Sequence, residues 1–186
     1  MRGRRAVSSG KRVELHRPRL ADAPEFCAGV GASADLHHPW LKAPVDRETF
    51  LAYLDRVQRP TCSGYIVRRA DTGDLAGFVN VNDIVTGALR SASVGYGAFV
   101  PHDGAGLLTE AVGLALDEGF GSLGLHRIEA NVQPGNDRSL ALVRRLGFQL
   151  EGYSRRFLHI EGDWRDHLRW AIVADEWLAR PDPLGA

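Results

Sequence analysis

The sequence predicts an α/β domain built on a mixed central sheet of about seven strands, flanked by about four helices. Short segments in which apolar and polar residues alternate recur along the chain, as expected of half-buried strands. Between them lie longer segments whose apolar residues fall on one face of a helix. Near the middle, a strand-like run ends in a proline and a glycine-rich turn that opens a helix, Ser91 to Ala111. Because strands and helices alternate, we expect helices on the faces of the sheet.

The first third of the chain is expected to form one strand and two helices. Val13 to Arg17 alternates like a half-buried strand and ends at a proline. Ala21 to Val30 has the pattern of a short helix with glycines near its end. Asp46 to Gln58 is the second helix, because its first residue can cap it and its apolar residues share a face. His37 to Trp40, between the helices, is expected to be a loop.

Three antiparallel strands follow, at Gly64 to Ala70, Leu75 to Asn82 and Ser91 to Val100. Asp71 to Asp74 separates the first two and has the composition of a hairpin turn. Leu107 to Phe120 is the next helix, since leucine, valine and alanine recur on one packing face.

The last part of the chain is expected to add three strands and one helix. His126 to Gln133 is a strand, and Ser139 to Leu146 is a helix that a glycine stops. Phe148 to Ile160 and Asp163 to Ala174 form a long hairpin around a Glu-Gly pair.

The chain of 186 residues is long enough for one domain with a full core. We expect that domain at residues 13–178, between a basic, flexible arm at 1–12 and a loose tail at 179–186. Alternatively, the basic arm could bind an acidic partner such as ribosomal RNA.

Composition narrows the classes of function. The formal net charge is zero, so no global field draws the chain to nucleic acid or to a membrane. No apolar run approaches the roughly 20 residues of a membrane helix, and no secretory signal is visible, so the cytoplasm is the expected compartment. Cys27 and Cys62 are isolated, and the histidines show no ligand spacing, so neither a disulfide nor a metal is predicted.

The turn from Asp103 to Thr109 has the composition of an anion site. The small residues Gly104 to Gly106 let a phosphate approach the main chain, and the helix start that follows offers free N–H groups. Alone, such glycines more often make only a tight turn. In the preceding strand, Gly95 and Gly97 flank Tyr96, which indicates a bulge or the close approach of a ligand.

Three segments resemble, in order, the GNAT superfamily of acetyl-CoA-dependent N-acetyltransferases. They are DGAGLLTEA, LHRIEANVQPGNDRSLALVRRLGF and EGYSRRFLHIEGDWRDHLRWAI, and they span close to half of the chain. Within the superfamily they are similar to the branch of ribosomal-protein N-terminal acetyltransferases of the RimJ/RimL type. The resemblance implies the GNAT fold, acetyl-CoA as the acetyl donor and an amine as the acceptor. It also makes a homodimer plausible.

The resemblance further implies a set of cofactor contacts. The backbone around Asp103 to Leu108 would bind the pyrophosphate, and Phe99 and Val100 would lie along the pantetheine. Asn136 and Ser139 would lie beside the acyl end of CoA or its pantetheine. The full set is Phe99, Val100, Asp103, Gly104, Ala105, Gly106, Leu107, Leu108, Thr109, Asn136 and Ser139.

The chain departs from the family pattern at three positions. Asp103 stands where the family usually has Arg or Gln, and an acidic group there would repel a pyrophosphate unless it turned away. Leu108 replaces a common glycine or alanine. Val143 stands where many members carry a tyrosine that serves as an acid.

Direct attack of an amine on a thioester needs a proton acceptor for the amine and a donor for the leaving thiolate. Glu129 is the first candidate base, although it could equally be an ion-pair partner for Arg127. Ser139 is the candidate donor to the thiolate, or a helix cap. His126 and His159 are alternates for proton transfer.

The acceptor is expected to contact aromatic residues, namely Trp40, Tyr96, Tyr153, Phe157 and Trp164. Arg165 to His167 are interpreted as part of the hairpin structure. The leading acceptor is the N-terminal α-amine of a protein such as a ribosomal protein. The alternatives are a small amine (a polyamine, amino sugar, antibiotic or amino acid) and a non-catalytic domain that binds CoA or a protein.

Overall fold

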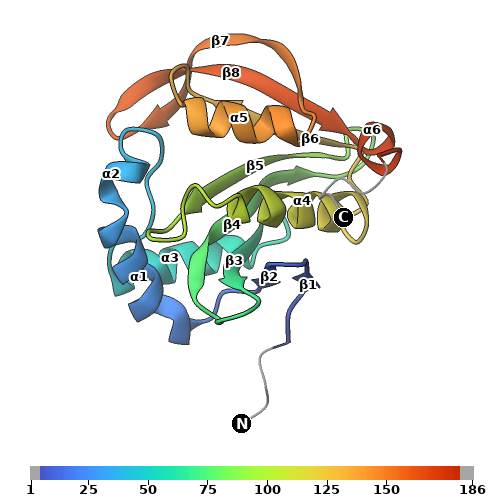
Figure 1. Ribbon diagram of the computed structural model, residues 1–186. Coiled ribbons are helices and arrows are strands. Elements are labelled where there is room, and N and C mark those ends of the chain that lie inside the picture. Colours follow the sequence, from blue (N-terminus) through green and yellow to red (C-terminus); the bar gives the residue numbers. More distant parts are fainter. Residues whose placement is uncertain (1–4, 181–186) are drawn as a thin grey trace.

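The structure is a computed structural model that describes residues 5–180 (Figure 1). It confirms a mixed sheet flanked by helices, with eight strands in the order β1-β2-β3-β4-β5-β6-β8-β7. The strands are β1 (Ser8–Ser9), β2 (Val13–His16), β3 (Ser63–Arg69), β4 (Leu75–Val85), β5 (Ser91–Ala98), β6 (Arg127–Val132), β7 (Gln149–Ile160) and β8 (Asp163–Val173).

The four expected helices are α1 (Ala23–Ala32), α3 (Arg47–Val57), α4 (Leu107–Phe120) and α5 (Asp137–Arg145). Three short ones were not expected, the 3-10 helix η1 (Leu20–Asp22), α2 (Ala34–His37) and α6 (Ala174–Leu178). No helix in residues 5–180 is long and apolar enough to span a bilayer.

One strand pair interrupts an otherwise antiparallel sheet. β5 and β6 run parallel, and they pair only at Ser91–Ser93 with Arg127–Glu129. Beyond this point β5 remains paired with β4, and β6 remains paired with β8. The two strands therefore diverge, and from Val94 onward the edge of β5 that faces β6 has no strand partner. An unpaired backbone edge inside a sheet can accept an extended ligand.

Helices cover both faces of the sheet because successive residues of a strand point to opposite sides. In β3, Tyr65 and Val67 join one core with α4, and Ile66 between them joins a second core with α1 and α3. The buried residues of α5 belong to the first core. Figure 1 shows α4 beside β5 and α5 beside β6, and residues of both helices line the gap between these strands.

The segment expected to be a loop at residues 37–40 is in part helical, because α2 includes His37. His37 is 5% exposed, and its ring packs against Phe78 and Phe99. Its Nε2 donates a hydrogen bond to the Ala98 carbonyl at 2.8 Å. These contacts with distant residues hold a helix of four residues that local propensity would not form alone.

The expected arm at residues 1–12 is ordered in its second half. Ser8–Ser9 pairs with Leu15 and Glu14 of β2, and Gly10 N donates to the Val13 carbonyl at 2.9 Å. The composition of these residues predicted a flexible arm, but backbone hydrogen bonds to the edge of the sheet order them. Residues 1–4 of the arm and 181–186 of the expected tail lie outside the described residues.

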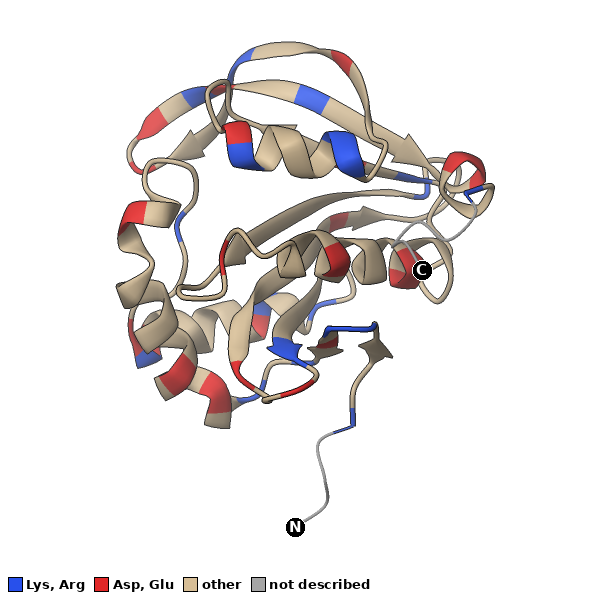
Figure 2. Cartoon of the chain, in the orientation of Figure 1, with Lys and Arg blue, Asp and Glu red and all other residues tan. Residues whose placement is uncertain are grey.

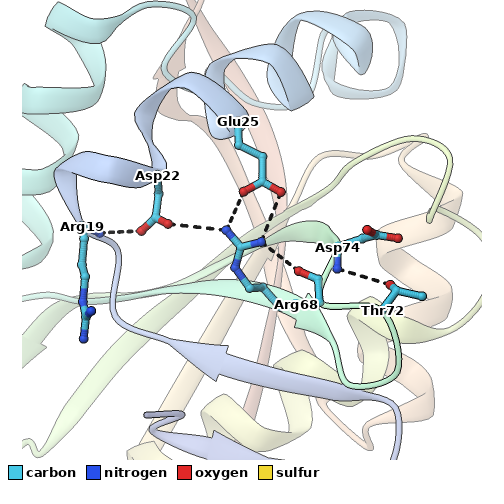
Figure 3. Close-up of polar contacts among 7 residues, drawn as sticks. Arg19, Asp22, Glu25, Arg68, Thr72 and Asp74 are labelled. Atoms are coloured by element: carbon cyan, nitrogen blue, oxygen red, sulfur yellow. Dashed lines mark hydrogen bonds and ion pairs between the residues drawn. The ribbon is translucent and has the colours of Figure 1, made fainter. Parts of the chain in front are cut away.

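A cluster of charges joins α1 to the β3–β4 turn (Figure 3). Arg68 donates to Glu25 at 2.6 Å, to Asp22 at 3.4 Å and to the Gly73 carbonyl at 2.8 Å. Its side chain is only 15% exposed, so these partners satisfy a largely buried cation. The cluster lies outside both cavities described below and has a structural role.

Candidate active site

Two adjoining cavities open where β5 and β6 diverge. The larger has a volume of about 520 Å³ and lies between the turn before α4 and one face of α5. The smaller, of about 110 Å³, lies between β5 and β6, and His167 of β8 contributes to its wall. The two cavities meet, since five residues line both, namely Trp40, Leu41, Tyr96, Asn136 and Ser139.

The turn before α4 presents backbone N–H groups to the larger cavity. Gly104 and Gly106 have φ angles of 75° and 77°, a left-handed conformation that favours glycine. Gly106 is the N-cap of α4, and no side chain caps this helix. The N–H groups of its first turn and the positive end of the helix dipole are therefore available to an anion in the cavity.

Glu110 fixes this turn from behind. The side chain is buried, and its carboxylate accepts hydrogen bonds from Arg12 N at 2.8 Å, Val13 N at 3.3 Å and Arg12 Nε at 2.9 Å. The Arg12 guanidinium also donates to the carbonyls of Ala105 at 3.0 Å and Gly106 at 3.3 Å. The negative charge of Glu110 is thus held away from the cavity and against β2, and Arg12 ties the turn to the same point.

Arginines from α5 line the opposite wall of the larger cavity. Arg138 and Arg145 both contribute to it, and they are seven residues apart, which places them on one face of a helix. Figure 2 shows basic residues at both ends of α5. Arg138 Nη1 donates to Asp103 Oδ2 at 2.8 Å, so the carboxylate that would repel a phosphate has a cationic partner.

Two hydroxyl groups lie where the cavities meet. Tyr96 as a residue is half-buried, but its hydroxyl oxygen is buried, and the Ser139 hydroxyl is its neighbour without a hydrogen bond of normal geometry in residues 5–180. Burial raises the pKa of Tyr96 to about 12, and the neighbouring Ser139 hydroxyl acts in the opposite direction. Tyr96 is therefore protonated at neutral pH and can donate a hydrogen bond. Asn136, rather than Ser139, caps α5, since its Oδ1 accepts from Ser139 N at 3.2 Å.

A buried histidine lines each cavity. His37 lines the larger one, and its Nδ1 has no hydrogen-bond partner in residues 5–180. His167 lines the smaller one, is 2% exposed, and has Nδ1 at 3.0 Å from the Arg165 carbonyl. Burial lowers the pKa of both imidazoles, so both are neutral at pH 7.

Comparison with known proteins identifies the family. Residues 12–149 match the family described as the acetyltransferase (GNAT) domain. The chain belongs to this family. It is thus an acyltransferase, an N-acetyltransferase of the GNAT type.

Curated relatives agree with this assignment. The probable N-acetyltransferase YjcK of Bacillus subtilis (strain 168) is 37% identical over 127 residues, which cover 68% of this chain and 70% of that protein. The ribosomal protein uS5-alanine N-acetyltransferase of Escherichia coli (strain K12) is 36% identical over 107 residues, which cover 58% of this chain and 55% of that protein. This chain thus matches about half the length of the uS5 enzyme.

A solved structure has the same fold over nearly the whole chain. Mycobacterium smegmatis RimJ, in complex with a CoA disulfide, has a TM-score of 0.83 and 29% sequence identity to this chain. The similarity covers 92% of this chain and 86% of that one.

In this GNAT domain most of the expected cofactor residues come together. The larger cavity is lined by Asp103, Gly104, Gly106, Leu107, Leu108, Thr109, Asn136 and Ser139. Phe99, Val100 and Ala105 do not line it. Phe99 is 1% exposed and packs into the core beneath α1, because strand alternation directs its side chain away from the gap. Ala98, which precedes it, lines the cavity instead.

Of the expected acceptor residues, Trp40 and Tyr96 line both cavities, and the other three line neither. Tyr153 is exposed and its hydroxyl contacts the Asp166 carboxylate. Trp164 is 57% exposed and packs on His159 at the end of the hairpin. Phe157 reaches the site only indirectly, through a ring contact of 6.0 Å with His167.

The structure places Glu129 outside both cavities. One of its oxygens accepts from Arg127 at 3.0 Å and the other from Arg169 at 3.0 Å. This is the ion-pair alternative that its sequence context allowed. The alternates His126 and His159 are exposed and line neither cavity.

Several residues of the site were not expected from the sequence. The helical spacing of Arg138 and Arg145 could have identified them as one face of α5. His37 and His167 gave no such signal, because each is placed in the site by pairing or packing between distant segments. The sequence around His167 indicates only a structural role in the hairpin, and its place in the cavity wall is a finding of the structure.

Proposed function

We propose that this chain transfers the acetyl group of acetyl-CoA to the N-terminal α-amine of a protein, such as a ribosomal protein. The acyltransferase class follows from the family. The donor and the acceptor are argued from the two cavities.

The larger cavity fits coenzyme A. Its pyrophosphate would accept hydrogen bonds from the N–H groups between Gly104 and Thr109, at the uncapped start of α4. Arg138 and Arg145 supply positive charge on the other wall. The amides of the pantetheine arm can pair with the edge of β5 that β6 leaves open. The RimJ structure with its CoA disulfide supports this use of the fold.

The smaller cavity is where the acceptor would enter, and the observation that carries the proposal is the absence of charge there. None of the residues that line it is Asp, Glu, Lys or Arg. A polyamine holds further positive charges that need carboxylate partners when they are buried. A protein N-terminus has one amine with a pKa of roughly 7.7–8.0, so a useful fraction is neutral near pH 7 without help.

The size of the cavity fits the same acceptor. About 110 Å³ accommodates the first residue of a peptide with a small side chain, while the rest of the peptide remains outside. The E. coli relative is named for an alanine of ribosomal protein uS5, which is a small residue. The amine nitrogen would form a bond to the thioester carbonyl carbon as the carbon–sulfur bond breaks. The Tyr96 and Ser139 hydroxyls can donate hydrogen bonds to the leaving thiolate.

The test compares acceptors on the full chain with saturating acetyl-CoA. CoA release is measured with peptides that begin with Ala or Ser and with spermidine as the rival substrate. We expect kcat/KM to be at least about tenfold higher for the peptides, a difference of about 1.4 kcal/mol in transition-state stabilisation. Preference for spermidine would overturn the protein acceptor. CoA binding without turnover on any amine would indicate a binding domain instead.

A further inference from the structure

Among the described residues that line the smaller cavity, His167 is the single group that can accept a proton near neutral pH. Of the residues that line this cavity, only Tyr96 and His167 have ionisable side chains. Tyr96 is protonated, since burial raises its pKa to about 12. Glu129, which precedes Ala130 of the cavity wall, is engaged by two arginines outside the cavity, and Asp166, which precedes His167, bonds to Tyr153 and Arg156.

The hydrogen bond of His167 determines which nitrogen is basic. Nδ1 lies 3.0 Å from the carbonyl oxygen of Arg165. A carbonyl can only accept, so Nδ1 carries the proton and Nε2 carries the lone pair. Within residues 5–180 no group donates a hydrogen bond to Nε2. The imidazole is therefore held in one tautomer, with an unoccupied acceptor atom in a residue that lines the acceptor cavity.

We propose that Nε2 of His167 accepts the proton of the attacking amine. This inference rests on the proposed entry of the acceptor through the smaller cavity. The amine nitrogen bonds to the thioester carbonyl carbon, and the carbon–sulfur bond breaks so that sulfur leaves with the electron pair. The nitrogen then gives one proton to Nε2, which later releases it to water, and the thiolate takes up a proton from water. No oxidant, reductant or metal is needed.

The surroundings keep His167 neutral and ready to act. Its pKa is lowered chiefly by burial, which the Arg165 carbonyl and the Asp166 carboxylate oppose. From β7, the Phe157 ring packs on it, and the guanidinium of Arg169 lies 5.4 Å over that ring. β5, β6 and the segment at Trp40–Leu41 bring no charged side chain to the cavity. The pKa of His167 thus lies below its usual value near 6.5, and the free base prevails at pH 7.

This arrangement also matches a weakly basic acceptor. An imidazole with a lowered pKa is a poor base toward an alkyl ammonium group of pKa near ~10.4. An α-amine of pKa roughly 7.7–8.0 is already partly neutral at pH 7, and after attack the new carbon–nitrogen bond makes the remaining proton of either amine acidic enough for an imidazole to accept.

The experiment uses the full chain as wild type, H167Q and the matched control H159Q, which changes an exposed histidine of the same hairpin. The acceptor is whichever amine the wild type acetylates best. We expect kcat of H167Q to fall about 100-fold or more at pH 7, with the Kd for CoA unchanged. H159Q should keep the wild-type rate. A kcat of H167Q within threefold of wild type would overturn the proposal.

The pH profile of the wild type tests the same point without a variant. Below the pKa of His167 the imidazole is protonated and cannot accept a proton, so kcat should fall on an acid limb whose midpoint lies below 6.5. H167Q should lack this limb, and added imidazole should restore part of its activity. A wild-type profile with no acid limb contradicts the proposal even if H167Q does not fold.

These outcomes separate the inference from the proposed function. An active wild type with an equally active H167Q removes only the role of His167. A wild type that acetylates spermidine in preference to peptides, while H167Q is inactive, removes only the protein acceptor. A wild type that binds CoA and acetylates no amine removes both.

Discussion

Asp103 and Arg138 form an ion pair of 2.8 Å that links the two walls of the larger cavity. Asp103 belongs to the turn before α4, and Arg138 lies in the first turn of α5. The Arg138 side chain is 70% exposed, and an exposed pair of this kind contributes at most about 1 kcal/mol. A phosphate that enters the cavity can therefore compete with Asp103 for the guanidinium.

Removing the charge of Asp103 is expected to tighten CoA binding. In D103N the negative charge beside the pyrophosphate site is gone and Arg138 is released, so the Kd for CoA should fall about threefold. R138A leaves Asp103 without its cation and should raise the Kd about tenfold. Calorimetry at low and high salt measures both. Weaker binding by D103N would mean that Asp103 orders the turn rather than opposing the ligand.

Glu110 is expected to act on CoA binding through the position of the turn. In E110Q the carboxylate that accepts from Arg12 and Val13 becomes an amide whose NH₂ group faces other donors. Loss of these buried hydrogen bonds should lower the free energy of unfolding by about 1–3 kcal/mol. The Kd for CoA should rise because the turn is no longer fixed to β2.

The control for Glu110 lies on the same helix. Among residues 5–180 the Glu118 side chain accepts a hydrogen bond only from Ser122, so E118Q should change stability by less than about 0.5 kcal/mol. Thermal unfolding with and without CoA measures stability and binding together. If E110Q and E118Q behaved alike, Glu110 would have no role in positioning the turn.

The hydroxyl of Tyr96 is expected to matter for the rate and not for the fold. Its oxygen is buried beside the Ser139 hydroxyl without a hydrogen bond of normal geometry, so Y96F should change the melting temperature little. If the hydroxyl donates to the leaving thiolate, kcat should fall about tenfold or more. Because burial raises the pKa of Tyr96 to about 12, the wild-type rate should not decline on the alkaline side up to roughly pH 10.

Tyr65 provides the matched control for Tyr96. It is a buried tyrosine of β3 that lines neither cavity. Y65F should therefore keep kcat. An equal loss of kcat in Y65F and Y96F would point to a general effect on packing.

The arrangement of the last two strands, β7 and β8, could be predicted from the sequence only in part. The hairpin of β7 and β8 was predicted from its alternation and its turn. Its orientation was not, because either strand of a hairpin can pair with a neighbour. The structure pairs β8 with β6, with Val132 opposite Leu168, and leaves β7 at the edge. His167 therefore reaches the smaller cavity, whereas Tyr153 and Trp164 lie outside it.

The sequence by itself determined the elements with a strong local cause. Alternation predicted seven strands, and the glycines at 104 and 106 predicted the turn because few other residues adopt its left-handed conformation. The segment from Asn136 to Ser139 was identified by its resemblance to a family. Tertiary structure alone decided where β5 and β6 diverge and that His37 lies in a helix. It also decided the strand pairing that places Glu129 in ion pairs with two arginines and His167 in the wall of the smaller cavity. These depend on contacts between residues far apart in the chain, whose energies no local pattern records.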